Sequence, residues 1–252
     1  MEFSGKVVLV TGGAKRVGRA IVLELARGGA RIVVHCHASR ADAENTCVAA
    51  RALGARAAVV TGDLAVSADV ERIATAAGAA FGRVDALVNN AAVFAPTPVA
   101  TLTDEQWDRT LSINLKAPYL LAVHLGRLMH AGQGGAIVNV ADWAAMRPYR
   151  GYLPYMVSKA GLIALTRGLA KTLAPTVRVN CVAPGPVLPP EDYSDAERSE
   201  LMRVTPLQRL GTPEDVARMV RFLIAEATFS TGGVYLVDGG RLQAAAAHSN
   251  TD

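Results

Sequence analysis

Short apolar runs rich in Val and Ile recur along the whole chain. Each run is nearly continuous in apolar residues and does not alternate with polar ones. Runs of this kind are typical of strands that are buried on both faces of a parallel sheet. The pattern predicts strands at Lys6–Val10, Arg31–His35, Ala57–Thr61, Ala86–Asn89, Ala136–Val140, Val177–Val182 and Val234–Val237.

Longer segments rich in Ala and Leu separate these runs and have the character of helices. They are Val17–Gly29, Arg40–Gly54, Ser67–Phe81, Thr103–Ala131 and Tyr155–Leu173, with a further helix beginning near Thr212. Strand and helix alternate to the end of the chain, and no Pro- and Ser-rich linker divides it. The pattern therefore predicts an α/β fold, a single domain with a doubly wound, mostly parallel sheet that is flanked by helices. We expect residues 1–252 to form this single domain.

Two segments interrupt the alternation. Pro184–Gly211 carries five prolines and little periodicity, between a predicted strand and a predicted helix. Long irregular segments in compact domains are often binding loops, so residues 185–211 are expected to form a substrate loop; an ordinary surface excursion is the alternative. Residues 241–252 are expected to be a flexible tail without a function of its own.

Composition narrows the class of protein. Hydrophobic residues make up 51% of the 252 residues, which excludes intrinsic disorder, while a formal net charge of +4 leaves a polyanionic partner open. Cys36, Cys47 and Cys181 match no zinc or disulfide spacing, so we expect reduced, buried thiols and no metal site. No apolar stretch reaches the roughly 18 residues of a membrane span, and the apolar run Val7–Val10 is too short for a signal peptide, so we expect neither. We expect a cytoplasmic protein.

A glycine-rich turn directly follows the first predicted strand and opens a helix. Such a turn presents free backbone N–H groups and the positive end of the helix dipole, which suits a pyrophosphate; a tight turn that binds nothing is the alternative. Arg16 adds a forked guanidinium that can reach phosphate oxygens or a flat polar ligand. The residues expected to contact a cofactor here are Gly12, Lys15, Arg16, Val17 and Gly18.

The end of the second predicted strand discriminates between the two nicotinamide dinucleotides. A carboxylate about 20 residues after the glycine turn would bind the ribose hydroxyls of NAD. This chain has His35, His37, Ser39 and Arg40 there, with no acid before Asp42. Imidazoles, a hydroxyl and a guanidinium suit a 2′-phosphate, so the segment predicts NADP(H).

Asp63 and Leu64 follow the third predicted strand. We expect them to hold the adenine, with the Asp63 carboxylate accepting from the exocyclic amine. A helix cap or turn role for Asp63 is equally compatible with the sequence.

Tyr155 and Lys159 lie four residues apart in a helical segment, so their side chains share one face. A nearby ammonium lowers a phenol's pKa by stabilising the phenolate. The pair therefore predicts that Tyr155 gives and takes a proton near neutral pH.

Several motifs occur together and in a characteristic order. They are TGGAKRVG at 11–18, Asp63-Leu64, Asn89-Asn90-Ala91, Asn114 within SINLKAPY, Tyr155 with Lys159, and Pro184-Gly185. Over residues 4–240 the chain thereby resembles the short-chain dehydrogenase/reductase family. The resemblance implies a seven-stranded Rossmann fold, a nicotinamide cofactor and a homotetramer, with Thr103–Ala131 and Tyr155–Leu173 as the candidate interface.

The resemblance also implies roles for individual residues. Asn90, Ala91, Pro184 and Gly185 would line the cofactor site, together with Tyr155 and Lys159. Asn114 would hold a water that links Lys159 to solvent. The alternatives are strand-end turn residues and an ordinary polar residue within a helix.

One position departs from the usual family pattern. The family normally places a serine thirteen residues before the tyrosine, and this chain has Asp142 there. A serine hydroxyl donates to a substrate carbonyl, whereas an ionised carboxylate only accepts and would repel a ketone oxygen. Asp142 suits a heterocycle that presents N–H donors or a ring nitrogen that takes up a proton.

Asp142, Arg16 and the segment HCHAS together resemble the pteridine reductase branch of the family. That resemblance implies that Phe94 stacks the pterin against the nicotinamide, although a lone Phe is more often a core residue. Tyr152 and Trp143 would border the substrate pocket. Ala92 replaces a serine that is frequent in the branch.

The sequence thus predicts an NADPH-dependent reductase of a dihydropterin-, dihydrofolate- or dihydromonapterin-like substrate. Hydride would go to a C=N carbon, with the proton supplied by Tyr155 or Asp142, and with Arg16, Phe94 and Tyr152 also contacting the substrate. A carbonyl or alcohol oxidoreductase, such as a 3-oxoacyl thioester reductase, and a non-catalytic NADP(H) sensor are the alternatives. Basic residues are scattered, except near the expected phosphate positions, so no nucleic acid partner is expected.

Overall fold

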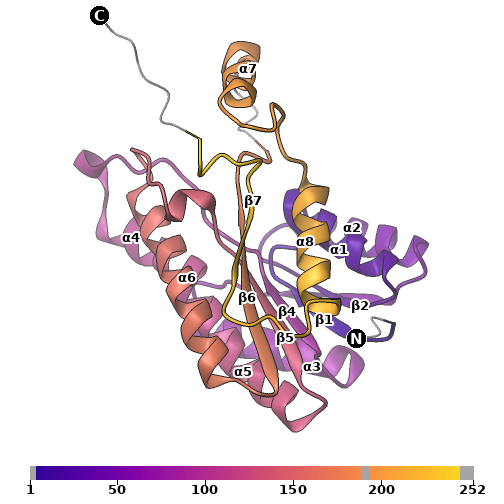
Figure 1. Cartoon of the computed structure of the whole chain (residues 1–252). Coiled ribbons are helices and arrows are strands. Elements are labelled where there is room, and N and C mark those ends of the chain that lie inside the picture. Colours follow the sequence, from indigo (N-terminus) through magenta and orange to yellow (C-terminus); the bar gives the residue numbers. More distant parts are fainter. Residues whose placement is uncertain (1–3, 189–192, 245–252) are drawn as a thin grey trace, which may run out of the picture.

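The Val- and Ile-rich runs form one sheet in the computed structural model, which describes residues 4–188 and 193–244 (Figure 1). The strand order is β3-β2-β1-β4-β5-β6-β7, and every neighbouring pair is parallel, so the sheet is wholly rather than mostly parallel. The strands are β1 (Val7–Val10), β2 (Arg31–Cys36), β3 (Ala57–Thr61), β4 (Ala86–Asn89), β5 (Gly135–Val140), β6 (Val177–Pro184) and β7 (Val234–Val237).

Helices cover both faces of the sheet. The helices of the described residues are α1 (Arg16–Arg27), α2 (Arg40–Ala52), α3 (Ser67–Phe81), α4 (Asp104–Leu111), α5 (Ala117–Ala131), α6 (Leu153–Thr172), α7 (Asp195–Arg203) and α8 (Pro213–Ala225), of which α7 lies away from the sheet. One apolar cluster joins the strands to α1, α2 and α8, and a second joins them to α3, α5 and α6. Burial on both sides explains why the strands read as continuous apolar runs.

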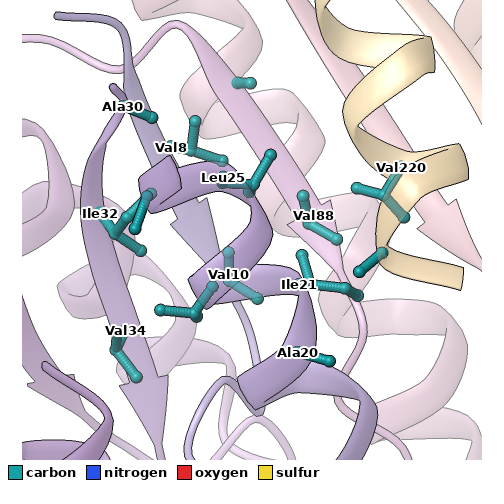
Figure 2. Packing of buried hydrophobic residues seen from close by; sticks show 14 of the residues in the cluster. Val8, Val10, Ala20, Ile21, Leu25, Ala30, Ile32, Val34, Val88 and Val220 are labelled. Carbon is teal, nitrogen blue, oxygen red and sulfur yellow. The ribbon is translucent and has the colours of Figure 1, made fainter. Parts of the chain in front are cut away.

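Successive residues of β1 enter opposite clusters. Val8 and Val10 of β1 belong to the cluster under α1 and α8, whereas Leu9 belongs to the cluster on the other face. Figure 2 shows Leu25 of α1 and Val220 of α8 contributing to the first cluster. The helices thereby hold the carboxyl end of β1, and the turn that follows it, in a fixed place.

Two predicted segments differ from the structure. The predicted helix Thr103–Ala131 is divided into α4 and α5 by a π-helical turn, Ser112–Lys116. The predicted irregular segment Pro184–Gly211 contains α7, which has no buried residue and therefore no apolar periodicity. Its sequence signal is the capping box of Ser194 and Glu197. Residues 189–192 of this segment and 245–252 of the predicted tail lie outside the described residues.

The strand order reverses between β1 and β4. In a doubly wound sheet, this reversal leaves a crevice outside the carboxyl ends of the two strands, where ligands bind. The glycine turn follows β1 and Asn90 follows β4, so the topology brings both to this crevice. Within residues 4–188 and 193–244, no helix combines the length and apolarity needed to span a bilayer.

Candidate active site

A cavity of about 970 Å³ opens at the carboxyl edge of the sheet. Most of the residues singled out from the sequence line it. They are Gly12, Lys15, Arg16, Val17, Gly18, His35, His37, Asp63, Leu64, Asn90, Ala91, Phe94, Asp142, Trp143, Tyr152, Tyr155, Lys159, Pro184 and Gly185. Ser39, Arg40 and Asn114 are not among the lining residues.

The glycine turn fits a pyrophosphate group. Gly12 has φ +61°, which favours glycine, and a Cβ on Gly18 would lie 2.0 Å from the Gly12 carbonyl oxygen. Helix α1 begins with no side-chain cap and no acid in its first turn, whereas α4, α7 and α8 each have a capping box. The first amides of α1 are thus left for a ligand, and an anion is the partner they favour.

Arg16 joins this turn to the segment after β6. It is a non-glycine residue with φ +50°, in the left-handed region. Its Nη2 donates to the Leu188 carbonyl at 3.3 Å. The guanidinium therefore lies between the expected phosphate site and the expected substrate loop.

His35 has a different place from the one predicted. It is only 2% exposed, and its Nδ1 accepts from the Gly12 amide at 3.3 Å while Nε2 lies 3.1 Å from the Gly62 carbonyl. These contacts fit the neutral ring with its proton on Nε2, and burial lowers the His35 pKa. The prediction that His35 receives a 2′-phosphate is therefore wrong in this structure, because no ring N–H is left to donate. The ring instead positions the glycine turn.

The basic residues predicted near the cofactor phosphates, Lys15 and Arg40, lie in different places in the structure. Lys15 lines the cavity and pairs with Asp42, with Nζ and Oδ2 2.8 Å apart. Arg40 opens α2, points its largely exposed side chain toward Glu44 at 3.7 Å, and is not a lining residue, and Ser39 lies at the N-cap. In this conformation neither Ser39 nor Arg40 lines the cavity, so their contact with a 2′-phosphate stays a prediction.

Asp63 has a local role and a tertiary one. Its Oδ1 accepts from the Ala65 amide at 2.9 Å, and Oδ2 accepts from Arg109 Nη1 at 3.2 Å. The Ala65 amide and then Arg109 keep the pKa of the Asp63 carboxyl low, so it is ionised. Arg109, on α4, also lines the cavity, and no pattern in the sequence singled it out.

Asp142 and Tyr155 form the centre of the site. The Tyr155 hydroxyl donates to Asp142 Oδ2 at 2.7 Å, and Oδ1 accepts from the Ala144 amide at 2.8 Å. Burial raises the pKa of Asp142. Burial and the neighbouring Asp142 charge also raise the pKa of Tyr155 well above its ordinary value. The phenol is therefore held in its neutral, proton-donating form.

Lys159 lies beneath this pair. It is 2% exposed, and its Nζ donates to the Val140 carbonyl at 2.6 Å. Burial lowers its pKa to about 8. The prediction that the ammonium lowers the Tyr155 pKa is wrong for the protein alone, because burial and Asp142 act in the opposite direction.

Asn114 is buried in the π-helical turn rather than exposed to the cavity. Its Oδ1 accepts from the Val93 amide, and Nδ2 donates to the Val93 carbonyl at 3.0 Å and to Ser158 Oγ at 3.1 Å. Ser158 in turn donates to the Tyr155 carbonyl at 2.7 Å. The Asn114 side-chain amide therefore braces the loop after β4 against α6. The sequence motifs did not single out Ser158.

Three aromatic rings form a wall beside the reactive groups. Phe94 stacks on Tyr152 with ring centroids 4.5 Å apart and meets Tyr155 edge-on at 4.8 Å. Tyr149, which was not predicted, meets Tyr152 edge-on at 5.5 Å. Phe94 is 48% exposed, so the alternative of a core phenylalanine is wrong. The Thr97 amide donates to the Gly151 carbonyl at 2.6 Å and holds the two loops together.

The sheet order, the uncapped glycine turn at the strand reversal and the Tyr–Lys helix define a Rossmann-type nucleotide-binding protein. The model of a protein family described as Enoyl-(Acyl carrier protein) reductase matches residues 12–241. Human Dehydrogenase/reductase SDR family member 4 is 39% identical over 94% of this chain and 87% of the human protein. The 3-oxoacyl-[acyl-carrier-protein] reductase FabG of Aggregatibacter actinomycetemcomitans is 35% identical over 93% of this chain and 98% of its own.

Solved structures agree with these relatives. FolM Alternative dihydrofolate reductase 1 from Brucella canis, complexed with NADP, superposes with a TM-score of 0.90 and 34% identity over 100% of both chains. The protein belongs to the short-chain dehydrogenase/reductase family, whose members are oxidoreductases that use a nicotinamide cofactor.

Proposed function

We propose that the protein is an NADPH-dependent reductase of a pterin or a similarly flat heterocycle. The hydrogen bond between Tyr155 and Asp142 carries this proposal. A ketone oxygen needs donors, and in this arrangement the phenol already donates to a carboxyl group that itself offers an acceptor. A heterocycle supplies what is missing, because its N–H groups donate to Asp142 and its ring nitrogen accepts a proton.

The cavity suits NADP(H) at its other end. The first amides of α1 would hold the pyrophosphate, Lys15, Arg16 and His37 supply positive or donor groups nearby, and Asn90 lies where β4 ends. Tyr155 and Lys159 would hold the nicotinamide ribose. When bound, the cofactor supplies a hydride. The NADP complex of the FolM relative supports this choice over NAD.

The proton follows a short path in this proposal. Hydride addition to the carbon of a C=N bond leaves the nitrogen to take a proton from the Tyr155 hydroxyl. Asp142, whose burial raises its pKa, returns a proton to Tyr155 or donates directly. Lys159 holds positive charge below the pair, and Phe94 supports the flat ring.

The remaining expectations join this proposal. We propose a cytoplasmic homotetramer that acts on a small molecule and not on nucleic acid. Residues 185–211 would be its substrate loop, which is supported by Leu188, Tyr193 and Leu201 lining the cavity.

The test is NADPH oxidation by the purified protein with dihydrobiopterin, dihydrofolate and a panel of ketones. We expect turnover of pterins and a loss of that activity in Asp142→Ser. Turnover of ketones but not pterins, or full pterin activity in Asp142→Ser, would contradict the proposal.

A carbonyl reductase is the second candidate, favoured by the FabG relative. A 3-oxoacyl thioester in the same assay separates it from a pterin reductase. NADPH binding without turnover of any substrate in the panel would instead indicate a sensor.

A further inference from the structure

Two arginines line the substrate end of the cavity, away from the glycine turn. Arg150 is exposed and Arg241 is partly buried. Within residues 4–188 and 193–244, neither forms an ion pair. Glu200 attracts Arg241, but its own carboxylate accepts from Arg203 Nε at 2.6 Å and Nη2 at 2.7 Å. Among the described residues, two positive charges are therefore left without a carboxylate partner at this end.

Arg241 is held in a defined position. Its guanidinium lies 5.4 Å from the centroid of the Trp143 ring, and Nη1 donates to the Val204 carbonyl at 3.4 Å. Arg147 Nη1 donates to the Arg241 carbonyl at 3.5 Å and to the Ala244 carbonyl at 2.5 Å. Arg147 thus holds the main chain of the segment that carries Arg241. Because Arg147 repels Arg241 and burial desolvates it, an anion would stabilise this arrangement.

Aromatic side chains connect the reactive centre to these charges. Tyr152 covers Phe94, Tyr149 extends the wall from Tyr152, and Arg150 directly follows Tyr149 in the chain. Trp143 directly follows Asp142 and carries Arg241 on its ring. The wall therefore continues beyond the position of a bicyclic heterocycle at Asp142 and Phe94. A second aromatic ring of the substrate would find stacking and edge-on partners there.

We propose that Arg150 and Arg241 form an anion subsite that binds the carboxylate of an aryl-conjugated pterin. The heterocycle lies at Asp142, the aryl group lies along Tyr149 and Trp143, and the carboxylate reaches the two arginines. The subsite rests on the proposed pterin reductase function and adds a preference for folate-type substrates over pterins with short neutral side chains. A phosphorylated pterin would present an anion but no aryl group, so the aromatic wall favours the carboxylate.

Steady-state kinetics at saturating NADPH tests this preference. For Arg150→Ala with Arg241→Ala, we expect KM for dihydrofolate to rise about three- to tenfold, as for loss of charge-assisted contacts that are partly exposed. The kcat should stay unchanged, since a contact remote from the reacting atoms binds ground and transition state alike. KM for dihydrobiopterin should change less than about twofold. High salt should raise KM for dihydrofolate but not KM for dihydrobiopterin, because salt screens exposed charges.

Matched variants separate this role from a structural one. Arg127→Ala removes an exposed arginine from the opposite side of the molecule, in the hollow between α3 and α5. It should leave KM unchanged for both dihydrofolate and dihydrobiopterin. Arg241→Lys keeps the positive charge, so its KM for dihydrofolate should lie between the value for Arg241→Ala and the wild-type value. Arg150→Ala alone tests the subsite should Arg241→Ala fail to fold.

A binding measurement makes the result independent of turnover. Calorimetry on the NADP⁺-loaded protein compares folate with its uncharged diamide. We expect folate to bind more tightly, and the difference to vanish in the double variant. Equal binding of the two ligands by the wild type, or equal KM changes for both pterins, would overturn the subsite. Wild-type protein that reduces neither pterin would instead refute the proposed function, and the calorimetry would then decide the subsite alone.

Discussion

At the scale of single residues, burial rather than proximity sets the protonation of the site. Asp142 and Tyr155 have raised pKa values, and Lys159 has a lowered one, so each is shifted toward its neutral form. Desolvation disfavours the charged form of every ionisable group. The packed site therefore moves all three pKa values in the direction that favours the neutral form.

Asp142→Asn should lower the pKa of Tyr155. The substitution removes the neighbouring charge that raises it, while burial remains. Tyrosinate absorbance followed against pH measures the change, with Asp142→Asn in a Tyr155→Phe background identifying the signal of Tyr155. An unshifted titration would show that Asp142 does not act on the phenol.

Lys159→Met should flatten the rise of stability between about pH 8 and 10.5. In this window the unfolded chain holds the lysine proton and the folded protein, with a pKa of about 8, does not. The unfolded state thus binds more protons, so the free energy of unfolding rises with pH, by at most about 1.4 kcal/mol per pH unit for one group. Buried Cys47 and Cys181 act oppositely but are common to both proteins.

Urea unfolding of the wild type and Lys159→Met across this window measures the difference. Lys171→Met, on the exposed side of the same helix, is the control and should keep the wild-type slope. Parallel curves for the wild type and Lys159→Met would contradict the assignment.

At the scale of elements, the start of α1 has neither a side-chain cap nor an acid in its first turn. Thr103, Ser194 and Thr212 close capping boxes on α4, α7 and α8. Helix α1 has none, and its first turn lies against Gly12 in the cavity. The first N–H groups of an uncapped helix have no hydrogen-bond partner, which makes the helix less stable. A bound anion would accept from these groups and interact favourably with the helix dipole.

Gly18→Ala should weaken both folding and NADPH binding. Its Cβ would lie 2.0 Å from the Gly12 carbonyl oxygen, so the turn must move, at a cost of about 1–3 kcal/mol. Gly168→Ala in α6 is the matched control, because no atom lies within 4 Å of its Cβ position. It should stabilise the protein by about 0.5–1 kcal/mol. Chemical unfolding and NADPH titration of both variants check this, and equal effects would contradict it.

At the scale of the whole molecule, the helices on one face of the sheet leave a largely apolar hollow between them. The hollow between α4, α5 and α6 is lined by Leu111, Leu115, Tyr119 and Leu165. Tyr119 is 47% exposed on it. These helices are the expected interface of the proposed tetramer.

Tyr119→Glu should therefore dissociate the tetramer, since it places a charge in an apolar contact. Leu128→Glu is the matched control, because Leu128 lies on the same helix with the same 47% exposure but borders the hollow beside α3. Light scattering should give a mass near that of four chains for the wild type and the control. A monomeric wild type, or tetramers in both variants, would refute the interface.

The sequence by itself determined the features that depend on local patterns. Neighbouring residues along the chain set the strands, the glycine turn and the spacing of Tyr155 and Lys159, so these features were predictable. The parallel sheet was predictable too, because its apolar strands alternate with helices. The sequence pattern did not predict helix α7, because none of its residues is buried and it therefore has no apolar periodicity.

The tertiary structure decided what depends on segments far apart in the chain. Four contacts of the site join different elements of the fold. They are the hydrogen bond of His35 with the glycine turn, the Asp63–Arg109 ion pair, the hydrogen bond between Asn114 and Ser158, and the stacking of Arg241 on Trp143. The pKa directions at Asp142 and Tyr155 were also decided there, because desolvation is a property of the packed site and not of residue order.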